Sequence, residues 1–183
     1  TIGAMNGRAL RHLDYYVTVS ELFKNMLISR GFDPHKCMSI YNGLDFEEKA
    51  SPFDRNAWLK ATGIDYEEGA VVLGILARLT PVKDIPTLLR AFAKARQGNP
   101  RLKLLIGGDG EDTEALKALA NQLKLGKSVS FMGWVTDVPH FFAACDIDVL
   151  CSISESFPYS ILEGIREGCA VITSDVGGMS RLI

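Results

Sequence analysis

Short apolar runs alternate with amphipathic stretches from Ala70 to the end of the chain. Runs rich in Val, Ile and Leu are typical of strands buried on both faces, whereas an apolar residue every three or four positions is typical of helices that cover a sheet. The predicted strands are 71–76, 102–106, 129–131, 147–151 and 170–173, and the predicted helices are 85–97, 113–124, 138–144 and 160–167. This alternation predicts a doubly wound α/β domain built on a parallel sheet.

The residues before Ala70 follow a less regular pattern. The predicted elements are the end of a helix at 8–13, a strand at 15–19, a helix at 20–29 capped by Ser20, a strand at 37–41, a turn at Asn42-Gly43 and a helix at 54–62. The sequence therefore predicts three parts. Residues 1–45 form the end of one domain, 46–69 a linker or hinge, and 70–183 a second domain.

The overall charge is close to balanced, with 20 basic and 22 acidic residues. This balance gives no electrostatic footprint for nucleic acid or for an anionic membrane. No apolar run reaches the roughly 18 residues of a membrane span, and we expect a soluble, cytoplasmic protein. Four separated cysteines, Cys37, Cys145, Cys151 and Cys169, predict buried thiols in a reducing compartment.

Two carboxylates, Glu155 and Glu163, lie eight positions apart across the junction between a predicted strand and a predicted helix. A strand that opens into a helix leaves free backbone N–H groups aimed at the opening, where they can hold phosphate. A carboxylate on each side can hold hydroxyls, so the segment suggests a nucleotide diphosphate that carries a sugar. The alternative is structural, with a loop acid followed by a first-turn acid favoured by the helix dipole.

A second segment, Gly74-Ile-Leu-Ala-Arg78-Leu-Thr-Pro-Val-Lys83-Asp, carries two cations after the first strand of the predicted sheet. In open α/β sheets, ligands bind at the C-terminal ends of the strands. Arg78 can engage phosphate oxygens in a fork, and Lys83 supplies a point charge. The alternative here is a solvated loop.

Three other patterns carry weaker chemistry. Gly107-Gly-Asp-Gly110 precedes a helix but lacks a complete phosphate-loop pattern, so it favours a tight turn whose backbone a ligand could still touch. Asp146-Ile-Asp148 resembles a metal-binding pair but opens a strand, at the end of the sheet opposite the expected crevice. The histidines are scattered and give little support for a nucleophilic triad.

Several segments together carry a family resemblance. They are Arg78 and Lys83, Phe131-Met-Gly133-Trp-Val135, Glu155 with Glu163, and Asp175-Val-Gly-Gly178. In this order and spacing they resemble the C-terminal half of the retaining glycosyltransferases of the GT-B fold, the glycosyl transferases group 1 family. The segments Tyr16-Val-Thr-Val-Ser20-Glu and Ile40-Tyr-Asn-Gly-Leu-Asp45 are similar to the end of that family's N-terminal domain and its hinge.

The resemblance implies a Rossmann-like C-terminal domain that binds a nucleotide-diphosphate sugar, in an enzyme of the hexosyltransferase class. Lys83 and Arg78 would hold the diphosphate, Glu163 the ribose, and Glu155 would stabilise the transferred sugar. The remaining donor-binding positions it implies are Phe157, Pro158, Tyr159, Ser160, Gly133, Trp134 and Val135. No metal or other cofactor is expected.

The sequence departs from the family pattern at two donor positions. Pro158 stands where the family has glycine and cannot donate a backbone hydrogen bond, and Asp84 stands in place of the glycine after Lys83. Most of the acceptor domain is absent from the sequence, so we expect a fragment that binds donor without efficient transfer. Peripheral membrane contact by that absent domain is left open, as are the acceptor and two alternatives, a sugar-nucleotide epimerase or a noncatalytic nucleotide-binding module.

Overall fold

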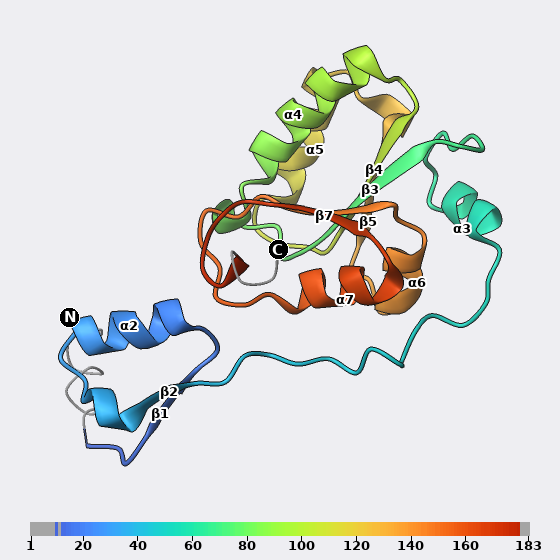
Figure 1. The fold of residues 1–183 in the computed structure, drawn as a ribbon. Coiled ribbons are helices and arrows are strands. Elements are labelled where there is room, and N and C mark those ends of the chain that lie inside the picture. The colour runs from blue at the N-terminus through green and yellow to red at the C-terminus, as the bar shows by residue number, and fades with distance from the viewer. Residues whose placement is uncertain (1–9, 11, 180–183) are drawn as a thin grey trace. The chain divides into compact units, whose positions relative to one another are not determined.

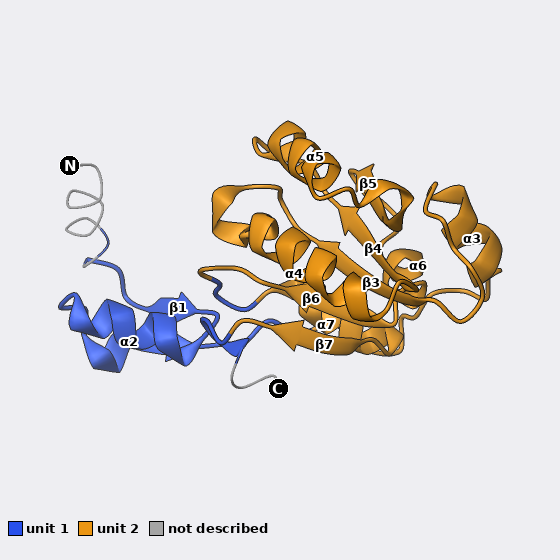
Figure 2. Cartoon of the chain, turned by 90° about the horizontal axis from the view of Figure 1, so that it is seen from above, with its two compact units in different colours: residues 1–43, 155–157, 175–183 blue, residues 44–154, 158–174 orange. Residues whose placement is uncertain are grey.

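A computed structural model describes residue 10 and residues 12–179, and these divide into two compact units (Figure 2). Unit 1 takes in the described residues up to Gly43, residues Glu155–Phe157, and the described residues from Asp175 on. Unit 2 takes in Leu44–Ser154 and Pro158–Ser174. Half of the helix end expected at 8–13 lies outside the described residues, and the domain limits at 45 and 69 stay a prediction.

Unit 2 contains a five-stranded parallel sheet in the order β5-β4-β3-β6-β7 (Figure 1). Its strands are β3 Val71–Leu76, β4 Leu102–Gly107, β5 Val129–Gly133, β6 Ile147–Leu150 and β7 Ala170–Thr173. Its helices are α3 Arg55–Ala61, α4 Ile85–Gly98, α5 Thr113–Gln122, α6 Val138–Ala143 and α7 Tyr159–Glu167, with one-turn 3-10 helices at η2 Pro81–Lys83 and η3 Gly126–Ser128. The predicted doubly wound α/β fold is confirmed.

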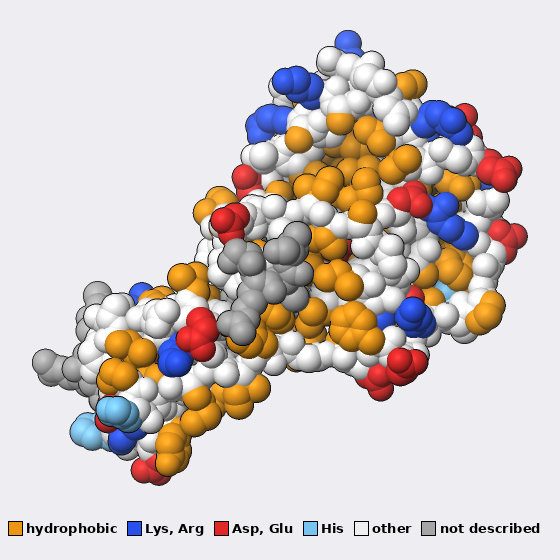
Figure 3. Space-filling view, viewed as in Figure 1, with side chains coloured by type: hydrophobic (Ala, Val, Ile, Leu, Met, Phe, Trp, Pro, Cys, Tyr) orange, Lys and Arg blue, Asp and Glu red, His pale blue; other side chains and the backbone are white. Residues whose placement is uncertain are grey.

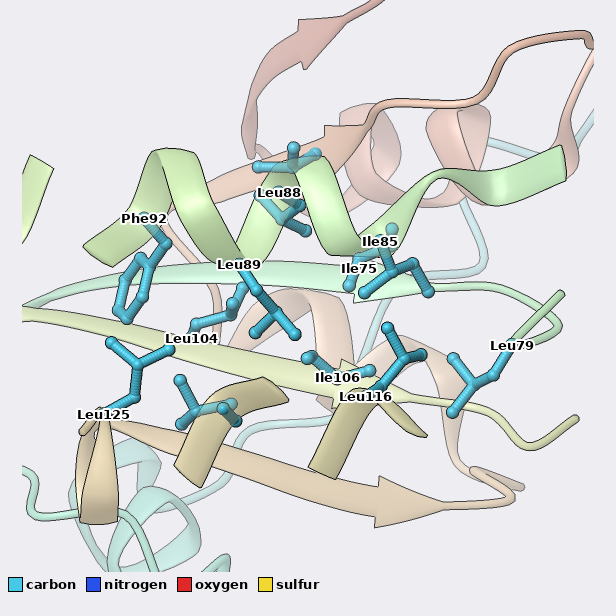
Figure 4. Packing of buried hydrophobic residues seen from close by; sticks show 13 residues of the cluster. Ile75, Leu79, Ile85, Leu88, Leu89, Phe92, Leu104, Ile106, Leu116 and Leu125 are labelled. Carbon is cyan, nitrogen blue, oxygen red and sulfur yellow. The ribbon is translucent and has the colours of Figure 1, made fainter. Parts of the chain in front are cut away.

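Helices cover both faces of this sheet. One face packs against α4 and α5 in a cluster of aliphatic side chains and Phe92, in which Leu89, Leu104 and Ile106 are fully buried (Figure 4). The other face packs against α3, α6 and α7, with Phe141 and Phe142 fully buried beneath it. The central strands β3 and β4 are covered on both sides and read in the sequence as largely apolar runs, whereas the edge strand β7 leaves alternate residues exposed.

Unit 1 contains a two-stranded parallel sheet and one helix. Its elements are β1 Tyr16–Thr18, α2 Glu21–Ser29, η1 Pro34–Lys36 and β2 Cys37–Ser39. The hydroxyl of Ser20 accepts a hydrogen bond from the backbone N–H of Phe23 at 3.3 Å, which confirms the predicted cap of α2. Tyr16 and Phe32 meet edge to face, with ring centroids 4.8 Å apart, and form the small core of this unit.

The turn predicted at Asn42-Gly43 is wrong, because residues 41–45 adopt no turn. The Asn42 side chain instead donates a hydrogen bond to the Phe157 carbonyl at 2.7 Å, within unit 1. Asn-Gly favours a turn only when the Asn side chain bonds locally, and here a distant carbonyl takes that bond.

Two surface features bear on the expected partners. On the face of unit 2 shown in Figure 3, Lys and Arg side chains are interspersed with Asp and Glu. Across the described part of the chain, no helix is both long and apolar enough to cross a membrane.

The four cysteine thiols are free, and Cys37, Cys145 and Cys169 are buried as predicted, whereas Cys151 is half-buried.

Candidate functional site

The strand order of unit 2 creates a switch point between β3 and β6. Chain connections leave these neighbouring strands in opposite directions, which opens a crevice beyond their C-terminal ends where ligands bind in such folds. The loop after β3 carries Arg78 and Lys83. It meets the loop after β6, because the backbone N–H of Ile153 donates to the Val82 carbonyl at 2.8 Å.

A thiol joins the same two loops. The Cys151 Sγ lies 3.1 Å from the Lys83 carbonyl and 3.3 Å from the Asp84 carbonyl, as a donor to both. Burial raises the pKa of Cys151 to about 11, so this thiol stays protonated and keeps the hydrogen that it donates. The cation-bearing loop is thereby held against the end of β6.

The backbone around Lys83 explains why glycine is expected after it. Pro81–Lys83 form the 3-10 turn η2, which the sequence did not predict, and Asp84 then takes a left-handed conformation with φ 46° and ψ 39°. Glycine adopts this region at little cost, whereas Asp is one of the few other residues found there. In the described structure, Asp84 is the N-cap residue of α4, but its carboxylate makes no capping hydrogen bond to that helix.

A cavity of about 240 Å³ opens beside Arg78. Its lining residues are Leu76, Ala77, Arg78, Gly108, Asp109, Trp134, Val135 and Val138. The structure thus brings Arg78 together with Trp134 and Val135, which come from separate segments of the sequence. The sequence reasoning missed the apolar walls at Leu76, Ala77 and Val138, because apolar residues at strand and helix ends carry no signal that separates a pocket from a core.

The glycine cluster after β4 forms a tight turn at the edge of this cavity. Gly108 has a φ of 117°, and a methyl group there would overlap the Ala77 carbonyl, so the backbone of this turn packs directly on the loop after β3. The Gly108 N–H donates to the Gly133 carbonyl at 2.7 Å, which ties the predicted donor residue Gly133 to the same turn. The favoured interpretation as a tight turn is confirmed.

Asp109 is the acidic residue of the cavity lining. Hydrogen bonds from the Thr113 hydroxyl, at 2.6 Å, and from the Gly110 N–H, at 2.8 Å, lower the pKa of Asp109. Its carboxylate is therefore charged at neutral pH and already bonded within the turn. This leaves Arg78 as the basic residue among those that line the cavity.

Helix α7 carries four of the predicted donor-binding residues. Pro158 is its N-cap, Tyr159 is half exposed, and Ser160 and Glu163 are half-buried. Burial raises the pKa of Glu163, and the positive charge of Arg166 partly offsets this rise. Because Pro158 has no N–H, the first backbone donors at this helix end belong to Tyr159 and Ser160.

Glu155 and Phe157 belong to unit 1. Phe157 is buried and meets Tyr41 edge to face, with ring centroids 5.0 Å apart. A methyl group at Gly177 would overlap the Glu155 carbonyl, so the segment Asp175–Gly178 packs directly on the segment that carries this acid. The expected roles of Glu155 and Phe157 stay predictions.

Asp146 of the Asp146-Ile-Asp148 pair serves the sheet itself. The Asp146 carboxylate accepts a hydrogen bond from the Val72 N–H at 2.7 Å and pairs with Arg55 at 2.9 Å, while Asp148 is 1% exposed. No group of three potential metal ligands occurs among the residues whose placement is described.

His140 fixes the segment that leads into α3. Its Nδ1 lies 2.8 Å from an Asp137 carboxylate oxygen, and its Nε2 lies 3.2 Å from both the hydroxyl and the carbonyl of Ser51. The hydrogen bond with Asp137 raises the pKa of His140. The order Ser-His-Asp matches that of a nucleophilic triad, but the Ser51 carbonyl at the same nitrogen favours an anchor that holds the backbone of residue 51. This contact could not be predicted from the sequence because 89 positions separate the two residues.

Comparisons with known proteins agree with this geometry. The family profile described as "Glycosyl transferases group 1" matches residues 57–183. The UDP-Gal:alpha-D-GlcNAc-diphosphoundecaprenol alpha-1,3-galactosyltransferase of Escherichia coli is 29% identical over 95% of this chain and 43% of its own length. A D-inositol 3-phosphate glycosyltransferase of Stackebrandtia nassauensis is 31% identical over 82% of this chain and 36% of its own.

A solved structure shows the same fold. The crystal structure of Anabaena HepE in complex with UDP and glucose superposes with a TM-score of 0.86 at 27% identity, over 98% of this chain and 50% of HepE. The chain spans less than half the length of the two curated relatives. The parallel sheet, the switch-point crevice and the family match agree, and the chain belongs to the glycosyl transferases group 1 family of GT-B glycosyltransferases.

Proposed function

We propose that unit 2 binds a UDP-linked hexose, and that the whole protein transfers this sugar to an acceptor hydroxyl with retention of configuration. The observation that carries the proposal is the cavity beyond the C-terminal ends of β3, β4 and β5, in which Arg78 lies beside Trp134 and Val135. Anabaena HepE, the similar structure described above, has been solved with UDP and with UDP-glucose. The transfer reaction is proposed for the whole protein, because the chain spans only part of its relatives.

The nucleoside would occupy the largely apolar side of the cavity. Val135 and Trp134 would contact the base, with backbone groups near Gly133 reading its edge. The Glu163 carboxylate would accept hydrogen bonds from the ribose hydroxyls. A carboxylate suits that task because it offers acceptors only.

The diphosphate would lie over the loop after β3. Arg78 and Lys83 would bind its oxygens, and the N–H groups of Tyr159 and Ser160 at the start of α7 would add hydrogen bonds. These fixed charges and dipoles would stabilise the leaving diphosphate in a reaction that requires no metal.

Glu155 would face the transferred sugar and stabilise the positive charge that develops at its reacting carbon, with Phe157 and Pro158 shaping the backbone beside it. Retention requires the acceptor to arrive on the face from which the diphosphate leaves. A leaving phosphate oxygen would then take the acceptor proton, so no strong protein base is needed.

Calorimetry with UDP, GDP and ADP tests donor binding. We expect UDP to bind most tightly and Arg78→Ala to weaken it by about 10- to 100-fold, the loss of a charge-assisted hydrogen bond worth about 1.5–3 kcal/mol. Arg90→Ala, which removes an exposed arginine on α4, is the matched control and should leave UDP affinity unchanged. Absence of binding by all three nucleotides, or an equal loss in both variants, would overturn the proposal.

Product analysis separates transfer from the alternatives. Formation of a glycosidic bond supports transfer, altered sugar stereochemistry would indicate an epimerase, and neither product would indicate a noncatalytic binding module. The family match and both curated relatives favour transfer.

We propose a cytoplasmic location, which is consistent with the four free thiols. We also propose that residues outside this chain make peripheral contact with a membrane.

A further inference from the structure

Asp148 is a buried acid that the proposed mechanism does not use. It is the second residue of β6, its side chain is almost entirely shielded from solvent, and its Oδ2 finds no hydrogen-bond partner among the described residues. A buried ionised carboxylate without a partner is costly, so such a group is retained as the neutral acid.

Helix α7 packs directly on this carboxyl group. Gly164 lies against Asp148 so closely that a methyl group at position 164 would overlap Oδ2. On the sheet, Asp148 is flanked by Gly74 of β3 and Val171 of β7, neither of which carries a charge. The residue before Gly164 is Glu163, the proposed ribose ligand, so the turn of α7 that packs on the buried acid also carries that ligand.

The charged and titratable neighbours of Asp148 are few. Burial and, after it, the negative charge of Glu163 on α7 together raise the pKa of Asp148 to about 8. Burial raises the pKa of the Cys145 and Cys169 thiols, and the charge of Asp148 adds to the rise in both. On its own strand the preceding acid is Asp146, paired with Arg55, and on α7 the positive charge of Arg166 acts on Glu163.

We propose that Asp148 is a positioning residue that acts through Glu163, so that donor binding depends on the protonation of a side chain that the donor never touches. This inference rests on the proposed role of Glu163. As a neutral acid, Asp148 leaves the Glu163 carboxylate free to carry the single negative charge of the pair and to accept the ribose hydroxyls. Two like charges at this contact oppose each other, and ionised Asp148 drives Glu163 towards its protonated form.

The sign of the pH dependence follows from linkage. A bound diphosphate adds negative charge near the pair and favours protonated Asp148, so binding takes up a proton once Asp148 has begun to ionise. Donor affinity is therefore level at neutral pH and falls above about pH 8, by at most tenfold per pH unit for one linked proton.

Carbon-13 NMR of the carboxyl groups tests the pair in the protein without ligand. We expect one Asp signal to titrate near pH 8, to be absent in Asp148→Asn, and to titrate at lower pH in Glu163→Gln, because that change removes the like charge. Asp65→Asn, at an exposed acid, should leave the signal in place. If no Asp titrates above pH 6, or if Glu163→Gln leaves the midpoint unmoved, the inference is overturned.

Calorimetry with UDP in buffers of different ionisation enthalpy then measures proton uptake between pH 8 and 9. Asp148→Asn copies the shape of the neutral acid, so we expect uptake by the wild type and the Asp65→Asn control and none by Asp148→Asn. Equal uptake by Asp148→Asn would refute the link to donor binding, even if the NMR result holds. No UDP binding by the wild type at any pH would overturn the proposed function and the donor link, while the NMR titration decides the coupling by itself.

Discussion

The two faces of the five-stranded sheet are built from different chemistry. Towards α4 and α5, the strands present Leu73, Ile75, Leu104, Ile106 and Val149, and the cluster contains aliphatic side chains and aromatic rings. Towards α6 and α7, the same strands present Gly74, the buried Lys103 and the buried Asp148, and two cysteine thiols lie among the packed side chains.

This difference indicates that the two faces of the sheet have different roles. The buried residues of the cluster on the first face are all apolar, so this face depends mainly on close packing, which stabilises the fold without any demand on geometry at the site. The second face carries α7, whose side chains include the proposed ribose ligand Glu163. The buried polar side chains of this face, Lys103 and Asp148, carry a cost in stability that the apolar cluster does not.

Loss of packing on the apolar face should give the largest effect. Phe92→Ala removes a ring that is 2% exposed, and we expect the free energy of unfolding to fall by about 3–5 kcal/mol. Under conditions where the variant is fully folded, its affinity for UDP should equal that of the wild type. Urea unfolding measures the first quantity and calorimetry the second. Arg90→Ala on the same helix controls for side-chain loss at the surface. If the free energy of UDP binding fell by as much as the free energy of unfolding, the apolar face would also shape the site.

The loop ahead of α4 should behave in the opposite way. Lys83→Ala removes a proposed diphosphate ligand at the end of the turn Pro81–Lys83, and we expect a loss of about 3 kcal/mol in transition-state stabilisation, roughly 100-fold in turnover. Urea unfolding should change little. Unaltered turnover in the full-length enzyme would remove Lys83 from the mechanism.

The close contact on the polar face can be tested with one methyl group. Gly164→Ala must displace α7 or Asp148, and we expect a loss of about 1–3 kcal/mol in the free energy of unfolding. Gly98→Ala at the end of α4, where a methyl group meets nothing within 4 Å, should be neutral or stabilising. Equal effects of the two substitutions in urea unfolding would contradict close packing of α7 on β6.

The smallest effect concerns the anchor at His140. The pKa of His140 is raised in the folded protein by Asp137, so the stability that this contact contributes is complete below the unfolded pKa, near 6.5, and is lost as pH rises through the higher folded value. His140→Gln should remove that part of the pH dependence. The check is to measure the free energy of unfolding of the wild type and of His140→Gln from pH 5.5 to 8.5 and to take their difference at each pH. A difference that does not vary with pH would show that the contact of His140 does not titrate.

Local pattern was enough to predict the sheet of unit 2. The strands Val71–Leu76 and Ala170–Thr173 were predicted at their observed bounds, because each is a run of apolar, β-branched residues between turn signals. The turn at Pro81–Lys83 was not predicted, because a single proline in a loop is compatible both with a break in the chain and with the start of a 3-10 turn.

Residues of the site could be predicted from the sequence only where the residue type itself indicates the chemistry. Arg78 and Trp134 could be named from the sequence, and the structure brings them to one cavity. The burial of Asp148 beneath Gly164 and the reach of Asn42 to Phe157 depend on pairs far apart in the chain. Neither residue type nor spacing records such contacts, so three-dimensional packing was needed to find them.

A crystal structure with bound UDP tests the central claim most directly, that unit 2 holds a nucleotide at the switch point between β3 and β6. The account predicts the base in the cavity beside Trp134, the ribose hydroxyls on the Glu163 carboxylate, and the diphosphate against Arg78 and Lys83. UDP bound elsewhere, or at this crevice with Arg78 and Glu163 both turned away from it, would contradict the account.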